Sequence, residues 1–128
     1  SLSQWFRYIF GVGEFYFGAK RFQPGIDGTW TGPSGRSLPV SLGTMKTDTP
    51  KRLLRNVRGK ADNARDAGLR GVIFHAMVTQ LTSDEVLVGL KAANPNQFPD
   101  WSVFERVILD WGDDAYLTID ANGYRVTP

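Results

Sequence analysis

Two carboxylates and one lysine near the start of the chain have the types and spacing of a metal-assisted site: Glu14, Asp27 and Lys46. Asp27 lies in the turn "PGIDG", so its carboxylate is expected at the end of a strand, where it can bind a hard cation such as Mg²⁺. We expect Glu14 to join this site from the end of a preceding helix, and Lys46 from a neighbouring strand. The structural alternative for Asp27 is a turn residue whose side chain accepts hydrogen bonds from nearby backbone N–H groups.

His75 is the only histidine of the chain and lies within the apolar run "GVIFHAMV". Histidine has an ordinary pKa near neutrality, which suits acid–base chemistry. A ribonuclease that needs no metal would use His75 as acid or base and the RNA 2′-hydroxyl as internal nucleophile. The hydroxyl of Thr79 is its expected partner. The alternative is a core histidine with satisfied hydrogen bonds.

Four cations are crowded into two turns of a predicted helix that starts at Pro50, and they favour binding to phosphates. The alternative is a solvated outer face, in which Asp62 and Asp66 pair with arginines at helical spacing. The four residues are Lys51, Arg52, Arg55 and Arg58.

A further group of carboxylates lies in "WGDDAY" and directly before it, and consists of Asp110, Asp113 and Asp114. Their spacing lacks the pattern of a calcium-binding loop. We therefore assign this stretch to a turn between strands.

The order of these features resembles the PD-(D/E)xK, or restriction-endonuclease-like, nuclease superfamily. In particular, the chain is similar to small nuclease domains at the C-termini of bacterial polymorphic and contact-dependent inhibition toxins. The resemblance covers about residues 14–80 and rests on "GID", "PVSLGTMKT", the basic helix "PKRLLRNVRGKADNARDAG" and "GVIFHAMV".

The resemblance implies a nuclease in which Asp27 and a second oxygen ligand, with Glu14 as the candidate, hold Mg²⁺. Lys46 would neutralise developing charge or orient the attacking water. The family places a second acidic residue two positions before the lysine, and Thr44 occupies that position here. Thr44 can form hydrogen bonds but brings no negative charge. Either the second carboxylate comes from elsewhere, or the enzyme does not depend on a metal.

The resemblance also implies a biological setting. The expected substrate is DNA or RNA, tRNA included, and the expected partner is an acidic immunity protein. The domain would be the tail of a larger secreted or cell-surface protein and would act in the cytoplasm of a target cell. Two alternatives stay open: the metal-independent ribonuclease built on His75, and a non-enzymatic module whose basic helix docks on an acidic protein.

The elements that position these residues are expected to form one α+β domain, with a central mixed sheet flanked by helices. Pro50 follows a potential N-cap, Thr49, and Thr82 or Ser83 with Glu85 forms a second capping signal. The other expected elements are a helix over 1–13, a hairpin of 26–31 with 37–47, strands over 71–78 and 103–111, and a C-terminal hairpin that turns at Asn122 and Gly123.

Composition limits the alternatives further. A chain of 128 residues fits a single domain, and the absence of cysteine excludes disulfides and thiolate metal sites. No apolar run is long enough to span a bilayer. Residues 1–71 contain twelve Lys/Arg and five Asp/Glu, whereas residues 72–128 contain three and eight. This asymmetry favours one surface that meets a polyanion and another that repels it.

Overall fold

The computed structural model describes residues 13–17, 26–112 and 116–127 of the chain. Within these ranges it contains seven strands, two α-helices and one short 3₁₀ helix. The elements are β1 (Glu14–Phe17), β2 (Gly28–Thr31), β3 (Ser37–Met45), α2 (Pro50–Asp66), β4 (Val72–Val78), α3 (Ser83–Ala92), η1 (Pro95–Gln97), β5 (Phe104–Asp110), β6 (Tyr116–Asp120) and β7 (Gly123–Thr127).

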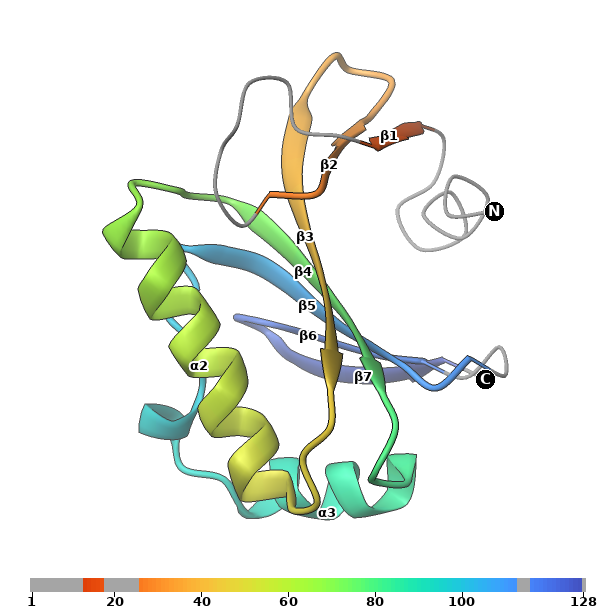
Figure 1. Cartoon of the computed structure of the whole chain (residues 1–128), viewed down its shortest axis with the longest axis vertical. Helices are drawn as coiled ribbons and strands as arrows, with labels where there is room; N and C mark the ends of the chain where they lie inside the picture. The colour runs from red at the N-terminus through yellow and green to blue at the C-terminus, as the bar shows by residue number, and fades with distance from the viewer. Residues whose placement is uncertain (1–12, 18–25, 113–115, 128) are drawn as a thin grey trace.

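The seven strands form one mixed sheet, and their order in the sheet is the same as their order in the chain. The central strands β3, β4 and β5 are parallel. The strands on either side of them pair as antiparallel neighbours. The sheet is strongly twisted, so that the β2–β3 hairpin and the β6–β7 hairpin point in very different directions (Figure 1).

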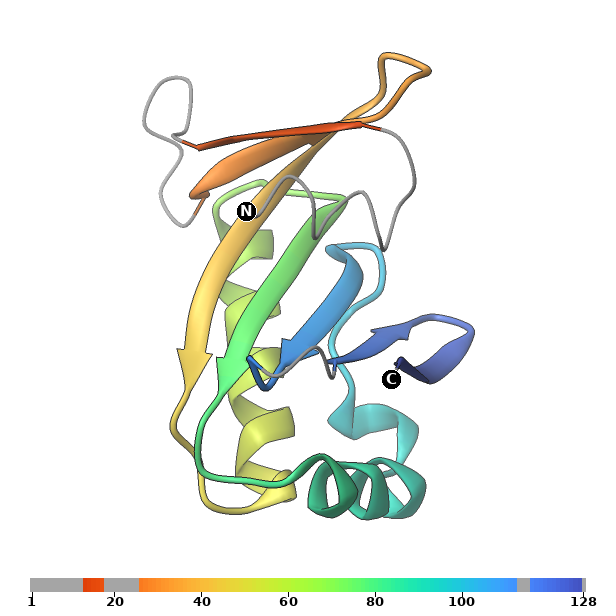
Figure 2. The same ribbon diagram turned by 90° about the vertical axis from the view of Figure 1, so that its right-hand side faces the viewer.

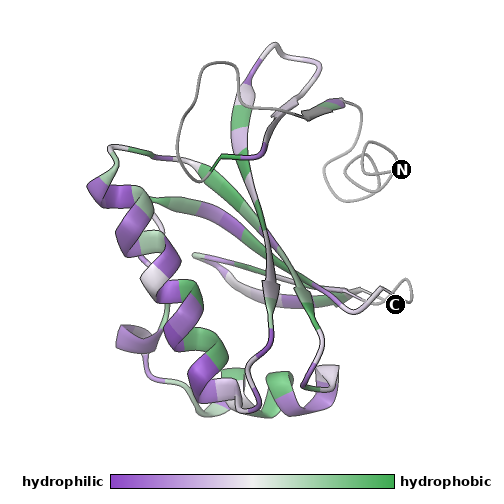
Figure 3. Cartoon of the chain, in the orientation of Figure 1, coloured by the Kyte–Doolittle hydropathy of each residue, from purple (hydrophilic) through white to green (hydrophobic). Residues whose placement is uncertain are grey.

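Helix α2, which connects β3 to β4, covers one face of the sheet. Helix α3, which connects β4 to β5, lies at the end of the sheet where β3 and β4 finish and packs into the same core (Figure 2). The main hydrophobic core lies between them and the sheet. Leu53, Val57 and Ala61 of α2 contribute to it and are at most 1% exposed. Figure 3 shows the corresponding pattern on α2, with hydrophobic positions toward the sheet and hydrophilic positions outward.

The opposite face of the sheet, here called the helix-free face, carries a smaller hydrophobic cluster. Its buried members all come from strands, and none of its described members comes from a helix. They are Phe15, Trp30, Val40, Ile73, Ile108 and Tyr116. Strand β4 is buried at six of its seven positions, as the apolar run "GVIFHAMV" indicates, although helices pack against only one of its faces among the described residues.

Local sequence signals explain where the helices begin and end. Thr49 caps α2 by accepting from the backbone N–H of Arg52 at 3.2 Å. Thr82 and Glu85 form a capping box at the start of α3. Gly68 follows the end of α2 with φ +79°, where a glycine avoids the steric cost that a Cβ would add.

The expected α+β class, the mixed sheet, the flanking helices and the C-terminal hairpin are all confirmed. The expected helix over 1–13 lies outside the described residues. Glu14 does not end a helix but begins β1. The C-terminal turn is also shifted from the expected position, because Asp120 pairs with Gly123 and the two loop residues are Ala121 and Asn122.

Candidate functional site

Asp27 occupies the turn before β2 and uses its carboxylate to hold the backbone. Its Oδ2 accepts from the backbone N–H of Leu42 at 2.7 Å, and its own N–H donates to the carbonyl of Val40 at 2.9 Å. These two contacts extend the pairing of β2 with β3 by one step. Asp27 is exposed, but one of its two carboxylate oxygens is already engaged in the role of a turn residue.

The register of the first three strands sets Glu14, Asp27 and Lys46 at three different levels. Glu14 is aligned with Thr31 at the far end of β2 from Asp27, a separation of about 13 Å along the strand. Lys46 follows the last residue of β3, about 17 Å beyond the level of Asp27 in the opposite direction.

This arrangement does not bring Glu14 and Asp27 to one metal ion, so the two residues do not fit the expected Mg²⁺ site. Among residues 13–17, 26–112 and 116–127, no three histidine or carboxylate side chains are grouped as metal ligands. Thr44 is exposed and lies on the helix-free face beside Met77. Asp48, the other carboxylate near Lys46, pairs with Arg52 at 3.1 Å.

The basic residues near the start of α2 are all exposed, as the sequence predicts for an outer face. Arg52 pairs with Asp48, and Arg58 donates to the backbone carbonyl of Asn96 at 2.6 Å. Lys51 and Arg55 have no carboxylate partner among the described residues. Because α2 covers the other side of the sheet, this basic face points away from the helix-free face (Figure 2).

The single histidine of the chain lies on the helix-free face and contacts a carboxylate. His75, in the middle of β4, places Nε2 at 3.1 Å from Oδ2 of Asp110, the last residue of β5. The other oxygen of Asp110 accepts from the backbone N–H of Gly112 at 2.8 Å. The side chains of His75 and Asp110 are 8% and 14% exposed, so a polar pair is buried at the end of the parallel strands.

Register explains how the two residues meet. His75 is aligned with Ile108, and Met77 with Asp110, on neighbouring parallel strands. Asp110 therefore lies one side-chain step beyond His75 on the same face. Polar residues of β6 lie level with these two positions across the sheet, since Thr118 is aligned with Ile108 and Tyr116 with Asp110.

Burial lowers the pKa of His75 below its ordinary value of 6.5, and the hydrogen bond and negative charge of Asp110 oppose this effect in part. The imidazole is therefore neutral at pH 7. A carboxylate can only accept hydrogen bonds, so we assign the ring proton to Nε2, which leaves Nδ1 unprotonated. This is the tautomer that a general base requires, with the carboxylate fixing the ring orientation.

Thr79 does not take the role that the sequence predicts for it. It follows the end of β4 and donates from Oγ1 to the carbonyl of Met45 at 3.4 Å. Sequence reasoning missed Asp110 as the partner of His75 because Asp110 was grouped with the "WGDDAY" stretch that follows it and assigned to a turn. The signal that would have found the pair is one polar residue inside an apolar strand, His75, and another at the end of a second apolar strand, Asp110, where the two strands are expected to be parallel neighbours.

Two further findings bear on the class of protein. No helix in the described part of the chain has the length and apolar character needed to cross a membrane. No family model matches the chain, and neither curated proteins nor solved structures show a significant match to it.

Proposed function

We propose that this chain is a ribonuclease domain in which His75 is the general base and Asp110 positions it. The observation that carries the proposal is the contact of 3.1 Å between His75 Nε2 and Asp110 Oδ2 on the helix-free face. The lowered pKa of His75 supports it, because the neutral form predominates at pH 7. The proposal invokes no metal, since acid–base side chains suffice for attack by the RNA 2′-hydroxyl.

In the proposed reaction, Nδ1 of His75 removes the proton of a ribose 2′-hydroxyl, and the 2′-oxygen attacks the adjacent phosphorus. The bond from phosphorus to the 5′-oxygen of the next nucleotide breaks, and that oxygen takes a proton from water. The hydroxide left behind is neutralised by the proton on His75, which returns the ring to its neutral form. The products are a 2′,3′-cyclic phosphate and a free 5′-hydroxyl. His75 is 6% exposed and its Nδ1 is itself buried, so the ribose has to displace covering atoms to reach that nitrogen.

Cations on the same face support the phosphate part of the reaction. Arg106 lies one row before His75, since it is aligned with Ile73 on β4. Arg125 of β7 is aligned with Thr118, in the row of His75, and is exposed. Guanidinium groups stabilise negative charge that builds up on a pentacovalent phosphate.

The setting that fits this proposal is the one that the resemblance implies: a toxin domain delivered to a target cell and held inactive by an acidic immunity protein. Lys51 and Arg55 of α2 offer exposed positive charge on the side of the sheet away from His75. An acidic protein can bind there, and so can a distant part of a long RNA. These surfaces are complementary in charge but separate from the catalytic pair.

The test is cleavage of total RNA, tRNA and plasmid DNA by the purified chain, with Mg²⁺ and with EDTA. We expect RNA cleavage that survives EDTA, leaves cyclic phosphate ends and spares DNA. His75→Gln should lower the rate by about 10²- to 10⁴-fold, the usual contribution of a general base. Asp110→Asn should lower the rate and move the acidic limb of the pH profile to lower pH, since Asp110 raises the pKa of His75.

Asp27→Asn serves as the discriminating variant. Loss of cleavage in EDTA and in Asp27→Asn, with His75→Gln still active, would overturn the proposal in favour of the metal-assisted nuclease. Absence of cleavage by a folded wild-type chain would favour the partner-binding module instead.

A further inference from the structure

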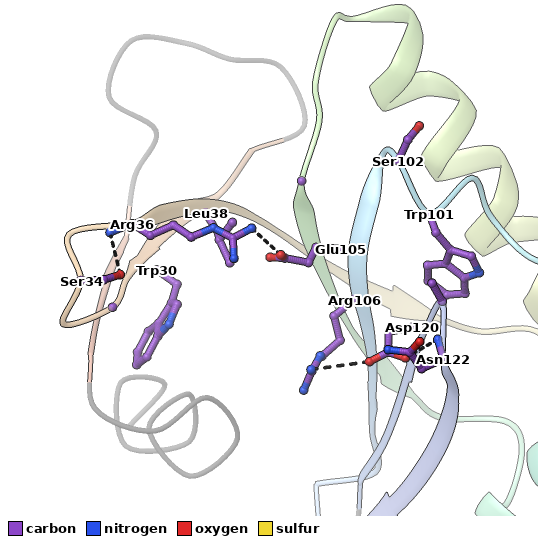
Figure 4. A pocket seen from close by; sticks show the side chains of 13 residues that line it. Trp30, Ser34, Arg36, Leu38, Trp101, Ser102, Glu105, Arg106, Asp120 and Asn122 are labelled. Atoms are coloured by element: carbon purple, nitrogen blue, oxygen red, sulfur yellow. Dashed lines mark hydrogen bonds and ion pairs between the residues drawn. The ribbon is translucent and has the colours of Figure 1, made fainter.

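A cleft of about 660 Å³ opens on the helix-free face, at the amino ends of β4 and β5. One wall is the turn between β2 and β3, which carries Arg36. The other wall is the β6–β7 turn with the loop that contains Trp101 (Figure 4). Glu105 and Arg106, at the start of β5, lie between the two walls.

The charges of the cleft alternate and balance. Arg36 reaches across to form an ion pair with Glu105, and Arg106 pairs with Asp120 at 3.6 Å (Figure 4). Among the described residues that line the cleft, the two cations and two anions give no net preference for a free anion. They favour a ligand whose edge offers both donors and acceptors.

The two carboxylates differ in what they can offer to a ligand. Asp120 uses Oδ2 for Arg106 and Oδ1 for the backbone N–H of Asn122 at 2.8 Å. Glu105 uses Oε1 for Arg36, whose side chain is 65% exposed. An exposed pair of this kind contributes little free energy and is readily exchanged. Glu105 is therefore the carboxylate that can accept hydrogen bonds from a bound molecule.

An aromatic surface lies beside this polar edge. Trp101 is partly buried and packs near Phe98, with ring centroids 6.5 Å apart. Trp30, on the other wall, is only 3% exposed and serves as packing. Trp101 thus offers the indole on which a planar ring can stack, the usual way in which proteins bind an unpaired base of RNA.

We propose that the cleft is a base-binding subsite that prefers guanine, an inference that rests on the proposed ribonuclease function. Guanine presents N1–H and N2–H donors on one edge, which suit Glu105, and O6 and N7 acceptors on another, which suit an arginine. Adenine has a donor in place of O6 and lacks the N1–H. Cytosine and uracil lack the second ring that covers the indole.

The location of the cleft matches that of the catalytic pair. Arg106 is aligned with Ile73, and the next residue of β4 on the same face is His75. The step between these two levels is about 7 Å along the strand. This separation is short enough for the base of one nucleotide to lie in the cleft while its ribose 2′-oxygen faces His75. Cleavage is therefore expected on the 3′ side of guanosine.

The first experiment measures binding of the four nucleoside 3′-monophosphates to His75→Gln, by calorimetry or by chemical-shift changes. Guanosine 3′-monophosphate should bind about tenfold or more tightly than the others, because a bidentate base contact supplies that order of discrimination. Glu105→Gln and Trp101→Leu should each remove the preference. Asp66→Asn, an exposed carboxylate on α2 away from the cleft, is the matched control and should keep it.

The second experiment maps the cut sites of the wild-type chain on a defined RNA. Cuts mainly after guanosine, and loss of that pattern in Glu105→Gln, would support the subsite. Equal binding of all four nucleotides, or an unchanged pattern in folded Glu105→Gln, would overturn it. Preferential guanosine binding without any RNA cleavage would overturn the ribonuclease proposal and leave the subsite standing.

Discussion

The two faces of the sheet differ in what they bury. The helix-covered face buries a continuous apolar layer from α2, α3 and alternate strand positions. The helix-free face buries a smaller apolar cluster and places charged or polar residues beside its members on neighbouring strands: His75, Arg106, Asp110, Thr118 and Asp120.

A buried polar group costs free energy unless it is well paired, so apolar residues would make the more stable core. On the helix-covered face the strands follow this rule. On the helix-free face they depart from it at His75 and Asp110, which form a single hydrogen-bonded pair. Departures of this kind concentrate at functional sites. The helix-free face, which has the smaller apolar core, is therefore the better candidate for the functional site.

The largest expected effect lies on the helix-covered face. Phe74 is fully buried and stacks on Phe104 with ring centroids 5.3 Å apart. Phe74→Ala should lower the free energy of unfolding by about 3–5 kcal/mol, measured by urea denaturation. Met77, on the same strand but the other face, is partly exposed, and Met77→Ala should cost clearly less. An equal loss of unfolding free energy in the two variants would contradict the view that the helix-covered face holds the stronger core.

A smaller effect should appear as a pH dependence that belongs to the helix-free face. The pKa of His75 is lowered in the fold, so between the folded and unfolded values the unfolded chain binds more protons. Stability should therefore fall as the pH drops below about 6.5, by at most about 1.4 kcal/mol per pH unit. Urea midpoints of wild type and His75→Gln between pH 5 and 8 measure this. The variant should lack that component; an identical pH dependence in both would contradict the assignment.

The smallest expected effect concerns the outer face of α2. Since the sheet separates Lys51 and Arg55 from His75, the double change to Gln should alter the cleavage rate of a short oligoribonucleotide by less than about twofold. Binding of long RNA should lose salt dependence, by about 0.7 in log–log slope for each phosphate contact removed. A tenfold loss of the cleavage rate on the short substrate would show that the outer face of α2 belongs to the same site as His75, and would contradict the separation of the two faces.

The sequence predicts the elements well where the signal is local. Thr49 with Pro50, and Thr82 with Glu85, act over three or four residues, and both helices begin where these signals indicate. The sites depend instead on strand register. Glu14, Asp27 and Lys46 are separated by their offsets along β1 to β3, whereas His75 and Asp110, 35 residues apart in the chain, are joined by the pairing of β4 with β5.

The charge asymmetry of the sequence likewise does not predict which charged side chains are exposed in the folded domain. The halves of the chain differ in net charge, but Arg36 of the basic half pairs with Glu105 of the acidic half. Among the described residues, the outer side of α2 keeps a group of exposed cations. Which charges stay exposed follows from contacts between distant residues, and composition alone does not contain them.

The order of the strands has a consequence for how the domain assembles. Each strand is added beside the one that precedes it in the chain, so no strand has to wait for a distant segment before it can pair. The longest closures are the crossovers through α2 and α3, and loop-closure entropy grows only slowly with length. The sheet of the described residues can therefore form progressively, strand after strand, and is expected to fold rapidly for a sheet of seven strands.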